Sequence, residues 1–185
     1  MLAVAATLIQ STPFEKKLFP PPAWQHGNYR GVQAERYHSA RLAVIGRFFD
    51  DYKRDGSDSL ATGTIGAVAY YSNMRIYDFY GLVDPHIAHL KRKRLGRGFP
   101  GHEKWDLLHV LSKKPTYVMF SRQLTRAAAP DPDYSYLITQ HDRAEIDKII
   151  QEDYRLISVW LVDRENSQAG YFTFLELKAR DRVCE

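Results

Sequence analysis

The sequence predicts one α/β domain, built on a mixed, mostly parallel sheet with flanking helices and a C-terminal β-hairpin. The chain has 185 residues, of which 44% are hydrophobic, so it is long and apolar enough for a single domain with its own core. Short apolar segments alternate with segments of helical periodicity, which is the pattern of strands joined by helices. The last two apolar segments, 155–163 and 171–178, are separated by seven residues and therefore predict a hairpin.

Two interpretations apply to the residues that precede this domain. Residues 1–9 form an apolar run without the basic region of a signal peptide, and the run has about half of the roughly 20 residues that a membrane-spanning helix needs. We expect residues 1–12 to be the end of a membrane helix or a buried N-terminal segment. The basic and aromatic residues that follow favour the membrane helix. Residues 13–31 contain three consecutive prolines and predict an extended connector, so the domain itself is expected over 32–185.

The first half of the domain is expected to begin with its longest helix. Apolar residues recur at helical spacing over 32–52, with arginines between them. The turn sequence DGSDS at 55–59 separates this helix from a strand expected at 60–65. Residues 67–72 continue that strand or form a short helix, and a second strand is expected at 76–80. With a helix between the two strands, this segment is a βαβ unit.

The second half is expected to add two helices and a buried strand before the hairpin. Asp84 and Pro85 are a favoured N-cap and first helical residue, and they predict a helix within 82–90. The apolar pattern predicts another helix over 102–113 and a buried strand at 116–120.

A last helix is expected just before the hairpin. Asp142 and Glu145, three residues apart, resemble a capping box at its start. Ile146, Ile149 and Ile150 would form its buried face.

The positive charge of the chain is concentrated in one loop. The sequence has 26 Lys and Arg against 22 Asp and Glu, a formal charge of +4, which is low for a dedicated nucleic-acid-binding protein. The basic loop consists of Lys91, Arg92, Lys93, Arg94 and Arg97. Such a run is usually solvated, and the functional alternative is contact with a phosphate or an anionic lipid. No aromatic platform accompanies it, so no nucleic-acid partner is expected.

No cofactor, metal or catalytic group is expected in this chain. The glycines of 96–101 match the dinucleotide-binding pattern, but they follow basic residues rather than a strand. Asp84, His86, His89 and His102 have ligand chemistry without a diagnostic metal-binding spacing. The single cysteine, Cys184, makes neither a disulfide framework nor a cysteine zinc site. No nucleophile elbow or catalytic carboxylate pair is present in the sequence.

Asp78 is the most unusual polar residue, because it lies inside the apolar strand expected at 76–80. An ionised carboxylate in such a place is costly unless it is paired or hydrogen-bonded. Two interpretations remain open: a functional carboxylate, or a structural one that accepts hydrogen bonds from backbone N–H groups or a tyrosine hydroxyl.

Three segments together resemble a known family. Residues 63–86 (GTIGAVAYYSNMRIYDFYGLVDPH), 100–104 (PGHEK) and 114–118 (KPTYV) are similar to the soluble C-terminal region of bacterial multi-spanning GT-C type membrane glycosyltransferases. These enzymes are related to protein mannosyltransferases and arabinofuranosyltransferases. The resemblance implies that the catalytic acid lies in a membrane loop outside this chain, and that Asp78 is not the base.

The resemblance also implies a role and a location. The domain would shape the acceptor side of a transferase that uses a polyprenyl-phosphate sugar donor, on the extracytoplasmic (periplasmic) side of the bacterial cell membrane. Its partners would be the upstream membrane domain of the same polypeptide and a polyprenyl phosphate or glycan. Tyr70, Tyr71, Asp78 and His102 would lie near the functional face, with the basic loop toward lipid or phosphate. The alternative is a stand-alone soluble α/β binding or scaffold protein of unknown ligand.

Overall fold

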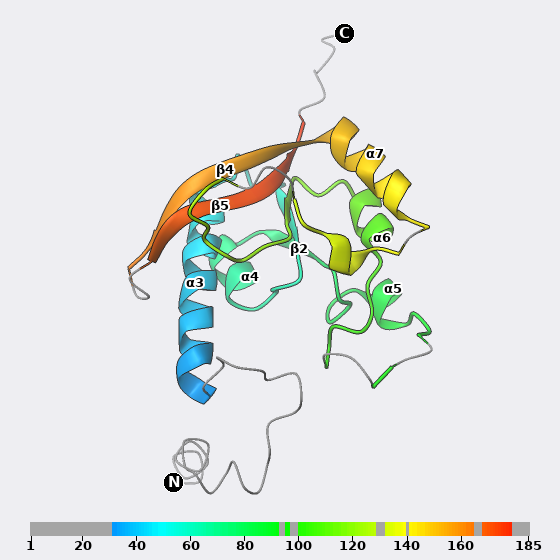
Figure 1. Ribbon diagram of the computed structural model, residues 1–185, viewed down its shortest axis with the longest axis horizontal. Helices are drawn as coiled ribbons and strands as arrows, with labels where there is room; N and C mark the ends of the chain where they lie inside the picture. Colours follow the sequence, from blue (N-terminus) through cyan, green and yellow to red (C-terminus); the bar gives the residue numbers. More distant parts are fainter. Residues whose placement is uncertain are drawn as a thin grey trace, which may run out of the picture.

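A five-stranded mixed sheet forms the centre of the protein, as a computed structural model shows (Figure 1). The structure describes residues 31–92, 95–96, 100–128, 132–139, 141–164 and 168–178. The expected membrane-helix end at 1–12 and nearly all of the connector lie outside these residues. Among the described residues, no helix is long and apolar enough to cross a membrane.

The strands are arranged in the order β2-β1-β3-β5-β4. Their bounds are β1 Ser59–Thr62, β2 Arg75–Asp78, β3 Tyr117–Met119, β4 Tyr154–Asp163 and β5 Gln168–Leu177. β1 pairs in parallel with β2 and β3, whereas β5 pairs antiparallel with β3 and β4. The mixed sheet and its C-terminal hairpin are therefore confirmed. The parallel part is smaller than expected, because the ten-residue hairpin strands make most of the ladder.

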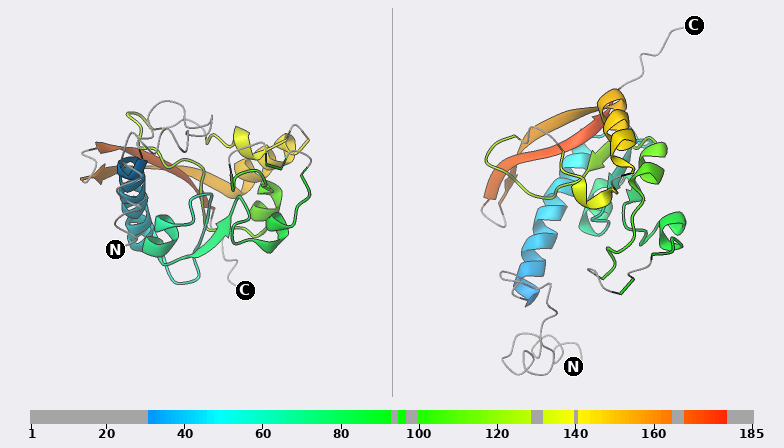
Figure 2. Two further views of the ribbon diagram at one scale, coloured as in Figure 1. Left: turned by 90° about the horizontal axis from the view of Figure 1, so that it is seen from below. Right: turned by 45° about the vertical axis from the view of Figure 1, so that its right-hand side comes forward.

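Helices cover both faces of this sheet. Their bounds are α3 Gly31–Tyr52, α4 Ala67–Ser72, α5 Pro85–Ala88, α6 Leu107–Ser112, the 3-10 helix η1 Ser135–Leu137 and α7 Arg143–Asp153. α3 and α4 lie together, apart from α5, α6 and α7 (Figure 1). The hairpin reaches both groups, with α3 and α7 each contacting β4 (Figure 2).

The core on the α3 face is aromatic. Ile45 and Phe49 of α3 are fully buried there, and the Phe49 ring centroid lies 5.2 Å from that of Phe174 on β5. α4 packs closely on α3 because Gly46 has no side chain: a Cβ there would lie 2.8 Å from the Cβ of Tyr71. The helix alternative for residues 67–72 is therefore the one observed, held by contact with α3.

The buried core on the opposite face is mostly aliphatic, with Phe79 and Tyr154 as its buried aromatic residues. The helices on this face are shorter than expected. Ile87, Leu107 and Ile146 are buried together there with Val118 of β3, whose neighbours in the strand face α3. The helix predicted over 102–113 forms only at its C-terminal half, where the Asp106 side chain accepts from the His109 N–H as the N-cap.

The expected helix caps are confirmed at one position and wrong at another. Asp84 caps α5 by accepting from the Ile87 N–H at 3.0 Å, with Pro85 as the first helical residue. Asp142 makes no cap hydrogen bond; its carboxylate accepts from the Thr139 hydroxyl at 2.6 Å. The Thr139 hydroxyl of the preceding loop thus bonds the Asp142 carboxylate, which in a capping box would accept from a backbone N–H of the helix.

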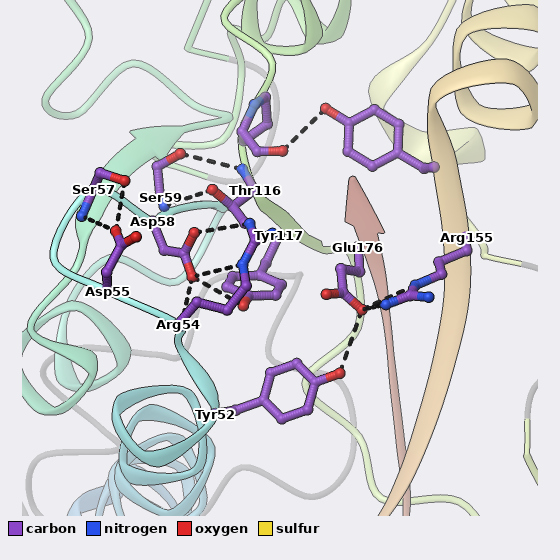
Figure 3. A network of polar contacts seen from close by, with 12 residues as sticks. Tyr52, Arg54, Asp55, Ser57, Asp58, Ser59, Thr116, Tyr117, Arg155 and Glu176 are labelled. Atoms are coloured by element: carbon purple, nitrogen blue, oxygen red, sulfur yellow. Dashed lines mark hydrogen bonds and ion pairs between the residues drawn. The ribbon is translucent and has the colours of Figure 1, made fainter. Parts of the chain in front are cut away.

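A paired polar network closes the amino ends of β1 and β3 (Figure 3). The buried Asp58 carboxylate accepts from the Arg54 guanidinium at 3.0 Å and from the Tyr117 hydroxyl at 3.1 Å. Ser59 and Thr116 exchange hydrogen bonds between each backbone N–H and the other hydroxyl, at 3.1 and 3.2 Å. Because these groups satisfy one another, the network joins the strands and leaves the carboxylate paired.

Candidate ligand-binding pocket

The connections that follow β1 and β3 leave the sheet toward opposite faces. β1 leads into α4 on the α3 face, whereas β3 leads through η1 into α7 on the other face. In open α/β sheets, ligands bind beyond the carboxyl ends of the strands at such a switch point. The switch point of this sheet lies where residues 62–64 and 119–123 are side by side.

A cavity of about 380 Å³ lies at this point. Its lining combines residues at and after the ends of β1 and β3 with residues from the loops that follow β2 and precede α6, and from η1 and the loop before it. The lining residues are Thr62, Gly63, Thr64, Tyr80, His102, Met119, Phe120, Ser121, Arg122, Gln123, Asp133 and Tyr136. This size is that of a small-molecule site.

Aromatic rings form part of the wall. The rings of Tyr80 and His102 lie 4.3 Å apart, and the Tyr136 hydroxyl donates to the Phe120 carbonyl at 2.6 Å. Burial raises the pKa of both Tyr80 and Tyr136, against the opposing effect of the nearby Arg122 charge. Both phenols stay protonated at neutral pH. The Tyr136 hydroxyl already donates its one proton to the Phe120 carbonyl, so of the two only the Tyr80 hydroxyl is left as a donor for a ligand.

Two opposite charges line the cavity without forming a described ion pair. Arg122, in the segment after β3, has no hydrogen bond or ion pair within the described residues. Asp133 accepts through Oδ1 from the Ser135 N–H at 3.1 Å and the Ser135 hydroxyl at 2.8 Å. These hydrogen bonds hold the pKa of Asp133 below its usual range. The cavity thus offers a cation and an acceptor carboxylate to a ligand.

Gln123 is oriented by a residue of α3. The Arg41 guanidinium donates to its Oε1 at 2.7 Å, and to the Gln168 side chain at 2.6 Å. Since Oε1 is the acceptor in this contact, the Gln123 Nε2 group is left as a donor. Arg41, which does not itself line the cavity, therefore determines that Gln123 has a donor rather than an acceptor free for a ligand.

Of the four residues predicted near the functional face, one lines the cavity and three lie elsewhere in the fold. His102 lines the cavity, as described above. Tyr70 is 80% exposed on α4, and Tyr71 lies under the Arg47 guanidinium at 4.4 Å from its ring centroid, so neither lines it. Asp78 is buried and accepts from the backbone N–H groups of Tyr80 and Val83 at 2.8 and 3.0 Å. These contacts support the structural interpretation of Asp78, which holds the turn that carries Tyr80.

The basic loop is described only in part. Lys91 is exposed, whereas the Arg92 guanidinium donates to the Trp105 carbonyl at 2.6 Å and lies over its ring. Arg92 is therefore engaged within the protein. Lys93, Arg94 and Arg97 lie outside the described residues.

The histidines considered as possible ligands are not brought together. His86 bonds the Asp106 carboxylate at 3.0 Å, His109 bonds that of Asp84 at 3.2 Å, and the two imidazoles stack at 4.0 Å. His89 bonds the Pro85 carbonyl in its own helix. Within the described ranges, no group of three or more His, Cys, Asp or Glu side chains has an arrangement that could hold a metal ion. The paired residues instead join α5 to α6.

Comparison with known proteins gives a family. The model of a family described as a domain of unknown function, DUF8728, matches residues 27–180. The chain belongs to the DUF8728 family. Searches of the curated proteins and of the solved structures gave no match. Every residue of the cavity lies within the part matched by DUF8728.

Four lining residues of this DUF8728 domain are missed by sequence motifs: Arg122, Gln123, Asp133 and Tyr136. A positional signal was available, because the first two follow the strand predicted at 116–120 on its carboxyl side, where α/β sheets carry their sites. Asp133 precedes η1 and Tyr136 lies within it, so only the folded chain brings these two residues to the cavity.

Proposed function

We propose that the domain binds a carbohydrate in this cavity. In this proposal it is the non-catalytic soluble domain of a membrane-embedded glycosyltransferase that uses a polyprenyl-phosphate donor, and it shapes the acceptor side. The observation that carries the proposal is the cavity at the switch point, where aromatic rings lie beside hydrogen-bonding side chains.

The composition of the lining suits a sugar. An aromatic ring packs on the C–H face of a pyranose or furanose, and Tyr80 and Tyr136 supply such rings. The Tyr80 hydroxyl is also a donor for sugar oxygens. The Asp133 carboxylate accepts from ligand hydroxyls, and the Gln123 amide donates to them. Directed polar groups in an otherwise partly apolar cavity are the usual source of ligand orientation.

The link to a glycosyltransferase is supported by where the resembling segments lie. Gly63, Thr64 and Tyr80 come from the first resembling segment and His102 from the second, and all four line the cavity. The resemblance to GT-C type C-terminal regions thus falls on the same place as the cavity.

The alternative, a stand-alone binding protein, would use the same cavity. The two differ in what precedes the domain. A natural reading frame that continues upstream through several hundred mostly apolar residues would favour the transferase. A loss of stability when residues 1–12 are removed would favour an internal segment of a stand-alone protein.

Asp133→Asn tests the sugar proposal most directly. The Asn side chain keeps an oxygen for Ser135 but loses the charge that strengthens hydrogen bonds from sugar hydroxyls. We expect neutral methyl glycosides of mannose, arabinose, glucose and galactose to include at least one that binds the wild type. The variant should bind that sugar about tenfold more weakly, corresponding to about 1.4 kcal/mol.

The matched control is Asp51→Asn, which removes the same charge from an exposed position on α3. Calorimetric or NMR titration measures both affinities. Absence of binding by every neutral sugar, or equal affinities of the two variants, would contradict the proposal.

A further inference from the structure

Arg122 is the cavity residue whose guanidinium has no polar partner in the part of the chain that the structure describes. It is partly buried and lines the cavity, yet no hydrogen bond or ion pair reaches it within the described residues. Arg54 and Arg155, by contrast, each form an ion pair, Arg54 with Asp58 and Arg155 with Glu176. A half-buried guanidinium that lines a cavity without a partner among the described residues is placed to pair with an anionic group of a ligand.

No carboxylate among the described residues forms an ion pair with Arg122, so an anionic group would have to come from the ligand. Asp133, the other charged residue of the lining, forms no described ion pair with Arg122 and already accepts two hydrogen bonds from Ser135. The Tyr80 and Tyr136 rings lie close enough for the Arg122 charge to act on both, and the Tyr80 hydroxyl is a neutral donor beside it. A cation with a neutral donor at its side suits an oxyanion.

Gln123 adds a fixed donor next to Arg122. Arg41 holds the Gln123 oxygen, which turns the amide N–H groups away from that contact. Arg41 is itself held in place by a second hydrogen bond to Gln168 at 2.6 Å. The donor is thus oriented before any ligand arrives, which reduces the entropy lost on binding.

We propose that the ligand of this cavity is an anionic sugar, carrying a phosphate or a carboxylate that Arg122 contacts and to which Gln123 donates. This inference rests on the proposed function and narrows it from sugars in general to acidic or phosphorylated ones. The guanidinium binds the anion, while Asp133 accepts from the hydroxyls of the same ligand.

The test titrates the full chain with glucose 1-phosphate, glucuronate, glucose and inorganic phosphate. At least one of the two anionic sugars should bind about tenfold or more tightly than glucose, the effect of one charge-assisted hydrogen bond. Tighter binding of glucose 1-phosphate identifies a phosphate as the recognised group, and tighter binding of glucuronate identifies a carboxylate. The preference should weaken as salt is added.

Arg122→Gln should remove this preference for anionic sugars over glucose. Arg122→Lys should restore part of the preference, because the charge returns without the bidentate geometry. Arg126→Gln, an exposed arginine of the same segment outside the lining, is the matched control and should keep the preference. A thermal melt of each variant verifies that the fold is retained.

The outcomes separate this inference from the proposed function. Sugars that bind with no preference for anions, or a preference that survives Arg122→Gln, would overturn the inference and leave the sugar-binding proposal standing. Inorganic phosphate that binds as tightly as glucose 1-phosphate, with no binding of glucose, would overturn the assignment of a sugar ligand and the proposed function with it.

Discussion

Gly63 shows how one residue makes room for the cavity wall. A Cβ at this position would overlap the Tyr80 ring, so only glycine lets the ring lie against the end of β1. The Tyr80 ring also contacts the His102 ring, with their planes tilted by 56°, and the Tyr80 backbone N–H is held by Asp78. The ring therefore has little freedom to move aside.

We predict that Gly63→Ala displaces the Tyr80 ring. Overpacking of this kind costs about 1–3 kcal/mol, and the displaced ring should also weaken sugar binding. Urea denaturation and ligand titration measure the two effects. Gly56→Ala is the control, since a Cβ there meets nothing within 4 Å. If both alanine variants behave alike, the close approach does not constrain the wall.

For single residues, the sequence shows which polar side chains are unusual more clearly than it shows what each side chain does. Asp78 is recognisable as unusual because a carboxylate in an apolar strand needs partners, and the structure supplies backbone N–H groups. Arg122 and Asp133 lie in polar segments where a charge is ordinary. Their importance comes from the shared cavity, which depends on contacts between segments far apart in the chain.

At the element scale, α5 and α6 are joined by two reciprocal pairs. Asp84 caps α5 and bonds His109 of α6, while Asp106 caps α6 and bonds His86 of α5. Each of the two carboxylates therefore serves both helices. This arrangement explains how helices of four and six residues are held, since such short helices are not stable alone.

We predict that Asp84→Asn reduces the acid sensitivity of the fold. Burial acts to raise the pKa of Asp84, but hydrogen bonds from Ile87 and His109 outweigh it and hold the pKa below its usual range. A lowered pKa in the folded state stabilises the protein above the unfolded pKa of about 4, and this contribution is lost as the pH falls through the folded pKa.

The variant should be less stable than wild type at pH 7 by about 1 kcal/mol, and the difference should shrink below about pH 4. Urea denaturation at a series of pH values measures it. Asp51→Asn on the exposed side of α3 should show no such convergence. A constant gap at all pH values would mean that the charge of Asp84 does not contribute.

Periodicity predicts the long elements and misses the ends of the short ones. α3 and the hairpin are found because many apolar residues repeat at one spacing. Residues 102–106 match a helical pattern, but Lys104 donates to the Ala88 carbonyl and the Trp105 carbonyl accepts from Arg92. Contacts with a distant segment therefore use the groups of the predicted first turn.

For the whole molecule, the two ends of the parallel strands have different chemistry. At the amino ends, Asp58, Arg54 and Tyr117 satisfy one another (Figure 3). At the carboxyl ends, Arg122 and the phenol of Tyr80 line a cavity. The alternation of strands and helices predicts that such ends exist, but the composition of each end depends on which loops meet there.

Tyr117→Phe tests whether the amino end contributes stability alone. Burial raises the pKa of Tyr117, as does the nearby Asp58 carboxylate, so the hydroxyl stays protonated and donates to Asp58. Its removal leaves the buried carboxylate short of a donor and should lower the free energy of unfolding by about 1–3 kcal/mol. Affinity for the sugar should stay within about twofold of wild type, because Tyr117 does not line the cavity. Urea denaturation and titration of the same preparation measure both quantities. An affinity loss as large as that of Asp133→Asn would mean that the two ends of the sheet are coupled, and that the amino end also contributes to binding.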